Sequence, residues 1–522
     1  MTFGGVFYLH IPERGLVMEY LSFLMALAPI AWLIFSLVVL KLPAHKTCTA
    51  TLVATIGIAV FGEWQMPVLG ATTAAAEGAA LALWPIMIVI IAAVFTYNLS
   101  TKTGSMNVIT KMLSSITTDR RLLVLIVAWG FGGFLEGVAG YGTAVAIPAS
   151  ILAAMGFAPM HAAVICLVAN TVPTAFGAIG IPISTMASVT GLPVETVSYL
   201  TALQLSIFIV LITFLVVALV DGFKGLKGVL GACLVSGFSF AIPQLYVAKF
   251  MGAELPCLVG SIFSMAATIA YTRMAHRSTA ATAEESLTAK DKLLAWVPYM
   301  LILTLIVLCS NLFPAIKGAA SSFKTVVTIY GDKPFAIKWL ATPGTLIIIA
   351  TYMGGLIQGV SLAEITKVLT STAKQLTKSA ITVVAIVALA KVMSYSGMIN
   401  TIAMVIAELT GSFYPFISPM VGALGTFVTG SDTSSNVLFG QLQMQVAAKI
   451  GVDQAWLVSA SAAGATAGKM ISPQSIAIAT AATGITGSEG RIMNKTIVVC
   501  GGYVLILGTL VYGCIPYLSA LY

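Results

Sequence analysis

The chain has 522 residues, of which 59% are hydrophobic and 8% are charged, and its mean hydropathy is +1.01. A soluble protein has about 25% charged residues and cannot bury so much apolar surface, so a soluble enzyme or binding domain is excluded. The net charge of +8 fits the excess of Lys and Arg in cytoplasmic loops of membrane proteins. No basic face with interleaved aromatic residues indicates nucleic-acid binding.

Apolar runs of about 20 residues, the length that crosses a bilayer, recur along the first half. The first run, Leu16 to Leu42, is too long for a signal-peptide core and has no clear cleavage signal, so we expect it to remain as a span. The other runs of this half are expected at 52–70, 79–97, 122–135, 143–155, 162–175, 200–220, 228–248 and 257–271.

A charged connector, Arg273 to Lys292, separates this half from the next, and a second polar stretch, Asn311 to Thr342, is expected to be a mixed loop. The later runs are expected at 293–310, 344–360, 380–393, 399–409, 416–428, 437–450, 456–467 and 497–521. The sequence therefore predicts an all-α polytopic membrane protein with a first half at 1–272, a cytoplasmic linker at 273–292 and a second half at 293–522.

The second half repeats the first. With an offset of 293 residues, Gly397 aligns with Gly104 and Gly430 with Gly137, without a gap between the two pairs. Loop charges place 102–121 and 364–378 in the cytoplasm, yet 364–378 aligns with a loop of the first half that is expected outside. The repeats are thus predicted to be inverted, although 311–342 is rich in lysine and must then lie outside.

Two interruptions of the apolar pattern are predicted in each half. GFGGFLEGVAGYGT (130–143) is rich in glycine, which disfavours a helix by about 1 kcal/mol per residue, and ANTVPTAFGAIGIPIS (169–184) contains prolines, which break the helix ladder. Their counterparts are FVTGSDTSSN (427–436) and GATAGKMISPQS (464–475). Secondary transporters bind their substrates at broken helices from both repeats, so we expect broken or re-entrant helices around one polar pocket.

Three ionisable side chains lie at these interruptions: Glu136, Asp432 and Lys469. A charge near the bilayer centre costs about 2.5 to 3.5 kcal/mol on insertion scales and is usually paired, hydrated or functional. We interpret Lys469 as an anion ligand; a structural ion pair and snorkelling to the surface are the alternatives. A nucleotide site is disfavoured, because the glycine spacing is too short for a P-loop and Met470 replaces its hydroxyl residue.

Hydroxyl and amide groups beside the interruptions suit a small carboxylate, since they offer donors next to free backbone N–H groups. Capping of a helix end is an equal alternative for each of them. Lys391, near the polar end of its apolar run, is either a pathway residue or a snorkelling side chain. The hydroxyl and amide candidates are Ser431, Thr433, Ser434, Ser435, Asn436, Asn170 and Thr171.

The seven cysteines are scattered, mostly within apolar runs, and are expected to be reduced packing residues. No His/Cys/Asp cluster with metal-ligand spacing and no nucleophile beside a base is evident. We therefore expect no metal, no organic cofactor and no enzymatic activity.

Four segments resemble the bacterial lactate permease family: FLEGVAGYGTAVAIP, LVANTVPTAFGAIGIPI, TGSDTSSNVLFG and GKMISPQSIAIATAATGITGSEG. The resemblance covers 130–183 and 427–491, and departs from the family pattern at Tyr141, where the family has phenylalanine, and at Ala144, where it has proline. It implies uptake or exchange of lactate, and often glycolate, with a proton across the bacterial inner membrane. The implied partners are a small monocarboxylate and the lipid bilayer.

The mechanism expected from these features is alternating access. Lys469 and residues 431–436 would hold the carboxylate, Asn170 and Thr171 its hydroxyl, and Glu136 or Asp432 the coupled proton. Further candidates for the substrate site are Tyr141, Gly142, Thr143 and Gln474. Transport of another organic anion such as a dicarboxylate, sodium coupling, a passive channel and a membrane-embedded enzyme remain alternatives; a homo-oligomer, stereoselectivity and the number of spans are left open.

Overall fold

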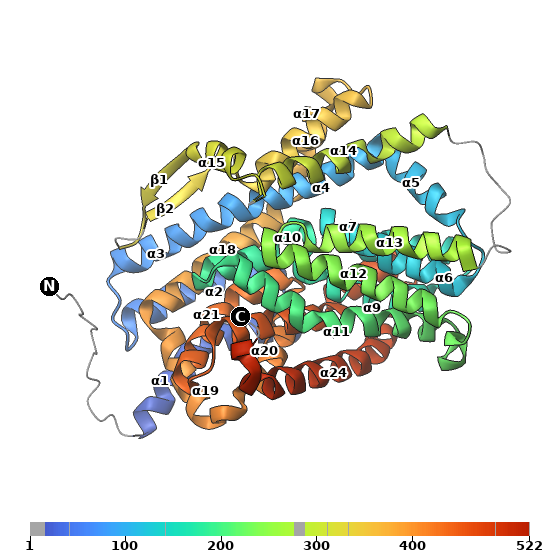
Figure 1. Ribbon diagram of the computed structural model, residues 1–522. Helices are drawn as coiled ribbons and strands as arrows, with labels where there is room; N and C mark the ends of the chain where they lie inside the picture. Colours follow the sequence, from blue (N-terminus) through green and yellow to red (C-terminus); the bar gives the residue numbers. More distant parts are fainter. Residues whose placement is uncertain are drawn as a thin grey trace.

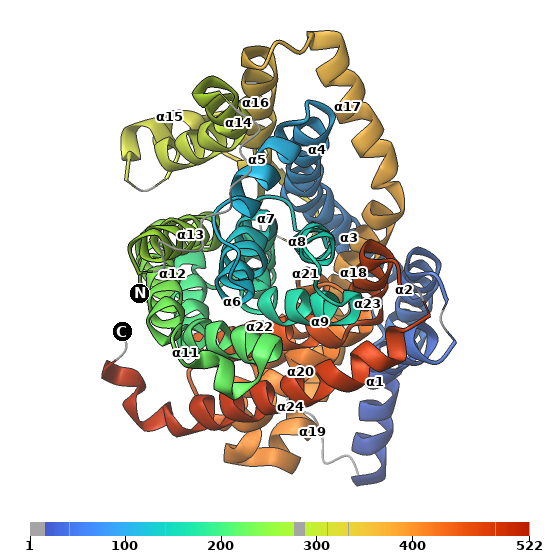
Figure 2. The same cartoon turned by 90° about the vertical axis from the view of Figure 1, so that its right-hand side faces the viewer.

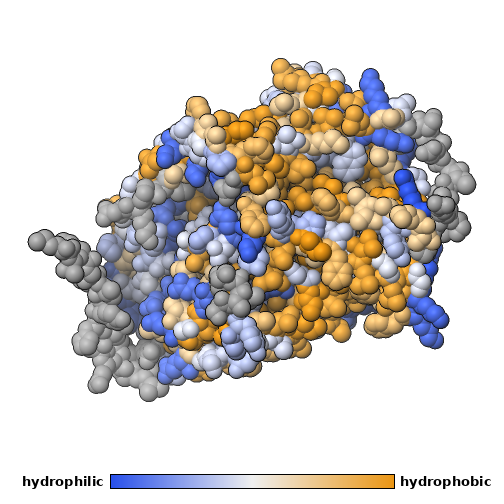
Figure 3. Space-filling view, viewed as in Figure 1, coloured by the Kyte–Doolittle hydropathy of each residue, from blue (hydrophilic) through white to orange (hydrophobic). Residues whose placement is uncertain are grey.

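The computed structural model describes residues 16–40, 42–140, 142–275, 288–310, 312–331, 334–485 and 487–520. Within these ranges, 12 helical stretches are long and apolar enough to cross a membrane. The long helices run roughly along one direction (Figure 1), and apolar residues cover the middle of the surface while hydrophilic residues gather toward its two ends (Figure 3). This is the surface of a multi-pass membrane protein, so the predicted helical membrane class is confirmed.

Residues 16–275 form helices, with two π-helical segments (Ala82–Met87 and Leu125–Phe131) and two 3-10 segments (Val172–Phe176 and Phe223–Leu226) between them. The helices are α1 (Leu16–Val38), α2 (Ala44–Phe61), α3 (Val68–Leu81), α4 (Ile88–Lys102), α5 (Ser105–Ser114), α6 (Arg120–Val124), α7 (Gly132–Val138), α8 (Thr143–Ala154), α9 (Pro159–Ala169), α10 (Gly177–Thr190), α11 (Val194–Asp221), α12 (Leu230–Met251) and α13 (Pro256–Ala275).

Residues 288–520 add further helices, one hairpin and two 3-10 segments (Gly411–Phe413 and Ile515–Ala520). The elements are α14 (Ala289–Leu308), α15 (Pro314–Ser322), β1 (Lys324–Thr328), β2 (Pro334–Lys338), α16 (Pro343–Ile357), α17 (Leu362–Gln375), α18 (Thr377–Ser396), α19 (Met398–Thr410), α20 (Tyr414–Thr429), α21 (Asp432–Ile450), α22 (Gln454–Ile471), α23 (Pro473–Thr483) and α24 (Glu489–Gly513).

Two local predictions are wrong. The apolar run at 52–70 is not one span, because α2 ends at Phe61 and α3 begins at Val68; the turn between them, GEWQMP, contains Glu63, Gln65 and Pro67, a short polar interruption within a long apolar run. The stretch 311–342 is not a plain loop, because it contains α15 and an antiparallel hairpin that pairs Lys324 with Lys338. β-branched residues in KTVVT favour this strand.

The helices form a central group and a flanking group. In a view along the helices, α8, α9, α21 and α22 lie near the middle, whereas α14, α16 and α17 lie to one side (Figure 2). The flanking helices pack on one another, α14 on α16 and α16 on α4, and α18 packs on α2 and α3. α18 and α4 also contact α21 and α10, respectively, so these two helices join the groups.

The central helices α20 and α22 approach one another closely because glycines face the contact. A Cβ added to Gly464 would lie 2.1 Å from the Pro419 carbonyl oxygen, and one added to Gly422 would lie 1.9 Å from that of Ser461. Small residues at helix contacts are the usual device for close packing in lipid. The glycines of GATAG therefore serve helix packing rather than phosphate binding.

The four predicted interruptions are confirmed. α7 ends at Val138 and α8 begins at Thr143; α9 gives way to a 3-10 turn before α10; α20 ends at Thr429 and α21 begins at Asp432; α22 ends at Ile471. The described cysteines are all free, and five of the seven are buried, as expected for packing residues.

Candidate functional site

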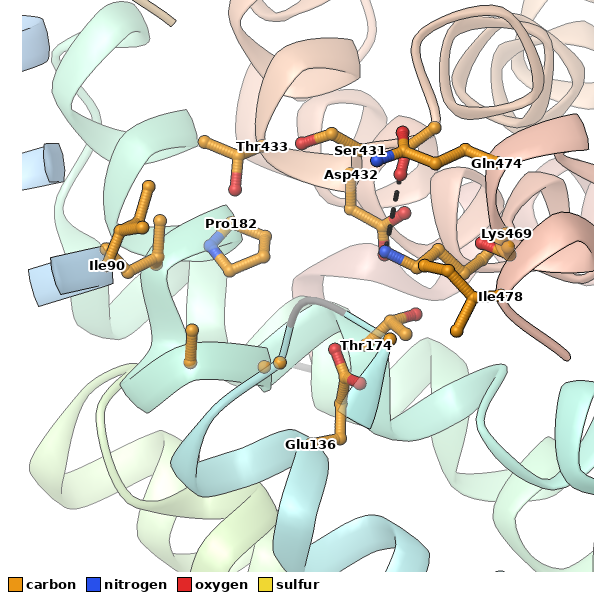
Figure 4. A pocket seen from close by; sticks show the side chains of 17 residues that line it. Ile90, Glu136, Thr174, Pro182, Ser431, Asp432, Thr433, Lys469, Gln474 and Ile478 are labelled. Carbon is orange, nitrogen blue, oxygen red and sulfur yellow. Dashed lines mark hydrogen bonds between the residues drawn. The ribbon is translucent and has the colours of Figure 1, made fainter. Parts of the chain in front are cut away.

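The four interruptions meet around one cavity of about 80 Å³ (Figure 4). Each contributes to its lining: Glu136 from α7, Thr174 from the 3-10 turn, Asp432 from the start of α21 and Lys469 from the end of α22. At about 10 to 15 Å³ of such space for one water, the cavity has room for roughly five to eight water-sized groups. The prediction of one shared polar pocket is confirmed.

Lys469 lies in the last turn of α22 and points into the cavity (Figure 4). Its Nζ donates to the Gly430 carbonyl oxygen at 3.4 Å, and it makes no salt bridge within the described residues. The carbonyl faces the amine because Gly430 ends α20 with φ +71°, a left-handed conformation that glycine adopts without strain. An ammonium group has three donors, so this amine has donors left for a ligand.

Glu136 and Asp432 approach the cavity from different sides, and each is 3% exposed (Figure 4). Lys469 is the cation that acts electrostatically on both carboxyl groups. Both oxygens of Asp432 and Oε2 of Glu136 have no hydrogen-bond partner in the described part of the chain. Two buried acids thus share one cation, an arrangement that is incomplete without a proton or another ligand.

The backbone beside Glu136 is held in an unusual conformation. Ala178 and Ile179, at the start of α10, have φ values of +44° and +57°, and a left-handed residue with a side chain costs about 1 to 2 kcal/mol. A Cβ on Gly177 would lie 2.5 Å from Glu136 Oε1. The strained turn therefore brings bare backbone against the carboxyl group, and such strain tends to occur at functional sites.

The candidates of the second half divide into cavity residues and packing residues. Ser431 and Thr433 line the cavity, and the Ser431 side chain also caps α21 by accepting from the Ser434 backbone N–H at 3.3 Å. Ser435 donates to the Gly422 carbonyl oxygen at 2.9 Å, and Asn436 to that of Pro182 at 3.0 Å; neither lines the cavity. Ser431 therefore fits both interpretations, because it caps α21 and also lines the cavity.

The remaining candidates divide in the same way. Gly142 and Gln474 line the cavity, and Asn170 is buried with its side chain beside Glu136. Thr171 and Thr143 donate to the carbonyl oxygens of their own turns, Leu167 at 3.2 Å and Gly140 at 2.7 Å. Tyr141 lies outside the described residues.

Some lining residues were missed by the sequence analysis, among them Thr174 and Ile478. Thr174 is a hydroxyl residue within a predicted interruption, so the same criterion that selected Thr171 could have selected it. Ile478 belongs to α23 and carries no signal of its own; it lines the cavity because α23 packs against α8.

Lys391 is not part of this cavity. Its Nζ lies 2.8 Å from Glu77 Oε1 and 3.1 Å from the Tyr395 hydroxyl, inside the protein rather than at the lipid surface. It lines a separate cavity of about 480 Å³, and a third cavity of about 210 Å³ shares Ser431 and Gln474 with the central one.

Comparisons with known proteins find relatives that match most of the chain. A family model described as L-lactate permease matches residues 22–517. The chain is similar to an L-lactate permease of Streptococcus iniae, with 49% identity over 84% of this chain and 93% of that protein, and to the glycolate permease GlcA of Escherichia coli K12, with 37% identity over 94% of both. Among solved structures it is similar to Neisseria gonorrhoeae MtrF, with a TM-score of 0.43 and 12% identity over 82% of this chain and 80% of that one.

Proposed function

Because this chain belongs to the L-lactate permease family, a family of transporters rather than enzymes, we propose that it carries L-lactate, glycolate and related 2-hydroxy monocarboxylates together with a proton. The proposed location is the bacterial cytoplasmic membrane, with the proton as coupling ion and no organic cofactor. The observation that carries the proposal is the Lys469 amine, which has free donors in a small cavity among four helix interruptions.

The size and chemistry of the cavity support a small monocarboxylate. Lys469 supplies the charge, while Ser431 and Thr433 supply hydroxyl groups for the rest of the molecule. A three-carbon hydroxy acid matches the available space. A dicarboxylate would bring a second negative charge beside Glu136 and Asp432 with no second cation among the lining residues.

Charge balance supports proton coupling. With one carboxyl group protonated, the three ionisable side chains of the cavity are neutral together; a bound carboxylate makes the site negative unless a second proton enters with it. An unbalanced buried charge is costly, so anion and proton favour each other's binding. Glu136 and Asp432 are the proposed proton acceptors.

The order of elements supports two inverted repeats, 1–272 and 293–522. α5 and α19 each follow a left-handed glycine, Gly104 and Gly397, that are aligned by the offset of 293 residues. In each half an interrupted helix, a helix pair and a second interruption follow: α7 to α10 in the first and α20 to α23 in the second. α5 and α19 lie toward opposite ends of the molecule (Figure 1).

The same arrangement supports an orientation. Lys102 pairs with Glu364 at 3.1 Å, so the loops before α5 and α17 lie at one end. The helices beside these loops carry the basic residues expected in the cytoplasm, Lys102 and Lys111 beside the first and Lys367 and Lys374 beside the second. The hairpin β1–β2 lies toward the other end (Figure 1), which is the proposed outer face despite its lysines.

Uptake by purified protein in liposomes tests the proposal. An imposed gradient, alkaline inside, should drive accumulation of labelled L-lactate, by about tenfold per pH unit if one proton moves with each anion. Unlabelled lactate and glycolate should compete, and succinate should not. Accumulation that follows a sodium gradient alone would refute proton coupling, and competition by succinate would refute the substrate class.

A further inference from the structure

We propose that the cavity around Lys391 is a second binding site, in which a monocarboxylate is captured at the hairpin end before it reaches the central cavity. This inference rests on the proposed function, because the ligand of the second site is taken to be the transported anion. The cavity of about 480 Å³ is lined by α3, α10, α18 and α21, and so lies between the flanking and the central helices.

Three side chains from two helices form a hydrogen-bonded cluster in this cavity. Glu77 of α3 accepts from Lys391 at 2.8 Å and from the Tyr395 hydroxyl at 2.7 Å, both of α18, and both bonds reach the same oxygen, Oε1. The other oxygen, Oε2, is buried and has no hydrogen-bond partner in the described part of the chain. A carboxylate held by one oxygen only is a weaker partner for the lysine than a bidentate or fully bonded one.

Lys391 retains capacity for a further ligand. Its amine contacts Glu77 and the Tyr395 oxygen, which leaves one of its three donors. Polar groups line the rest of the cavity, among them Ser394 of α18, Thr190 of α10 and Gln441 of α21. The Thr190 hydroxyl donates to the Met186 carbonyl oxygen and Gln441 Nε2 to that of Val189, so the Ser394 hydroxyl and the second N–H of Gln441 are the donors left for a carboxylate.

The two cavities follow the same face of α21. Thr433 lines the central cavity, while Val437 and Gln441 line the Lys391 cavity. These residues are four apart and so share one face of a helix. At 1.5 Å per residue, Thr433 and Gln441 are about 12 Å apart along the axis, a short path for a small anion when the helices separate.

Tyr330, in the loop of the hairpin, shows that the Lys391 cavity lies at the hairpin end of the protein. Its ring stacks on Tyr395 with a centroid separation of 4.1 Å. The cavity that contains His45 and Lys378 adjoins the central cavity through Ser431 and Gln474 instead. The Lys391 cavity therefore serves the hairpin side, which the proposed orientation places outside.

An anion can pair with Lys391 only if the amine releases its partner Glu77. Glu77 and a bound carboxylate accept from the same amine, so removal of the negative charge of Glu77 should favour the anion. The groups that face Glu77 are Lys391 and Tyr395 of α18 and, behind them, Tyr330. α10 and α21 contribute no titratable side chain to the lining.

The two partners of the pair should have opposite effects when they are neutralised. We expect Lys391→Gln to raise the half-saturating L-lactate concentration about tenfold for uptake from the hairpin side. Glu77→Gln should lower this concentration several-fold, because the competing carboxylate is gone. Right-side-out and inverted membrane vesicles separate the two faces, and Lys449→Gln, which changes an exposed lysine of α21 outside this cavity, is the control.

Transport from the opposite face shows that the variants are folded, since its half-saturation should not change. Equal losses from both faces in Lys391→Gln and Glu77→Gln would assign the pair a structural role and refute the second site. An unchanged half-saturation in Lys391→Gln, with saturable wild-type uptake, would refute it as well. Failure of the wild-type protein to take up lactate would instead refute the proposed function.

Discussion

The two halves of the protein interrupt their helices in the same places but equip them differently. The first half supplies one acid, Glu136, next to glycines and a left-handed turn at Ala178. The second half supplies the lysine, the other acid and a serine cap at the start of α21. Both halves share the helix interruptions, but only the second half supplies the lysine. A bound anion is therefore expected nearer to the second half. Substitutions at these residues test this asymmetry.

The largest effect is expected from Lys469→Gln. Loss of a charge-assisted hydrogen bond in a buried site costs about 3 kcal/mol, so the half-saturating L-lactate concentration should rise roughly 100-fold. Uptake and exchange assays in liposomes measure it. Lys449→Gln, at an exposed position of α21 outside the central cavity, should leave uptake unchanged; an unchanged affinity in Lys469→Gln would remove this lysine from the carboxylate site.

The variants of the two acids should have different effects on transport. We expect one of the two isosteric variants, Asp432→Asn or Glu136→Gln, to abolish accumulation against a gradient while lactate exchange continues, because exchange needs no net proton movement. The other should weaken both activities. Uphill accumulation retained by both variants would contradict a proton site at this pair.

Gly430→Ala should reduce lactate transport about tenfold more than Gly484→Ala. Both glycines end helices with φ +71°, so the backbone strain of a side chain, about 1 to 2 kcal/mol, is common to both. Only at Gly430 does the added Cβ also meet a neighbour, the Gln474 Oε1 at 2.1 Å, whereas nothing lies within 4 Å at Gly484. Equal effects of the two changes would show that the contact with Gln474 does not matter.

The smallest effect is expected from Ser431→Ala, a rise of a few-fold in half-saturation, since loss of an N-cap costs about 1 kcal/mol. Ser361→Ala is the matched control, because Ser361 caps α17 through a bond of the same 3.3 Å length far from the cavity. Thermal unfolding should show similar losses in both variants, and transport a loss only in the first. A transport loss of the same size in Ser361→Ala would mean that capping alone explains Ser431.

The sequence predicted those features that depend on composition along the chain. Glycine and proline marked the interruptions, and the charges at Glu136, Asp432 and Lys469 stood out because they lie at these interruptions. The turn between α2 and α3 was missed although it contains Glu63 and Gln65, because so short an interruption hardly lowers the mean hydropathy of a long apolar run. The left-handed Ala178 and Ile179 also carry no local signal, because tertiary packing imposes their conformation.

Contacts between distant residues were beyond the sequence pattern. Lys391 was a candidate with two interpretations, and its partner Glu77 lies 314 residues earlier in another apolar helix. Similarly, Ser435 and Asn436 follow Ser431 in a run of polar residues, yet the helix directs them to carbonyl groups of α20 and α10. The direction of a side chain on α21, rather than its type, decides whether it can contact a ligand.

A cryo-electron microscopy map of the protein saturated with L-lactate would test the central claim most directly. We expect density for the anion in the central cavity, with its carboxylate within hydrogen-bonding distance of Lys469 Nζ and close to Ser431. An empty central cavity with the substrate bound elsewhere, or a Lys469 side chain turned away from the bound anion, would contradict it.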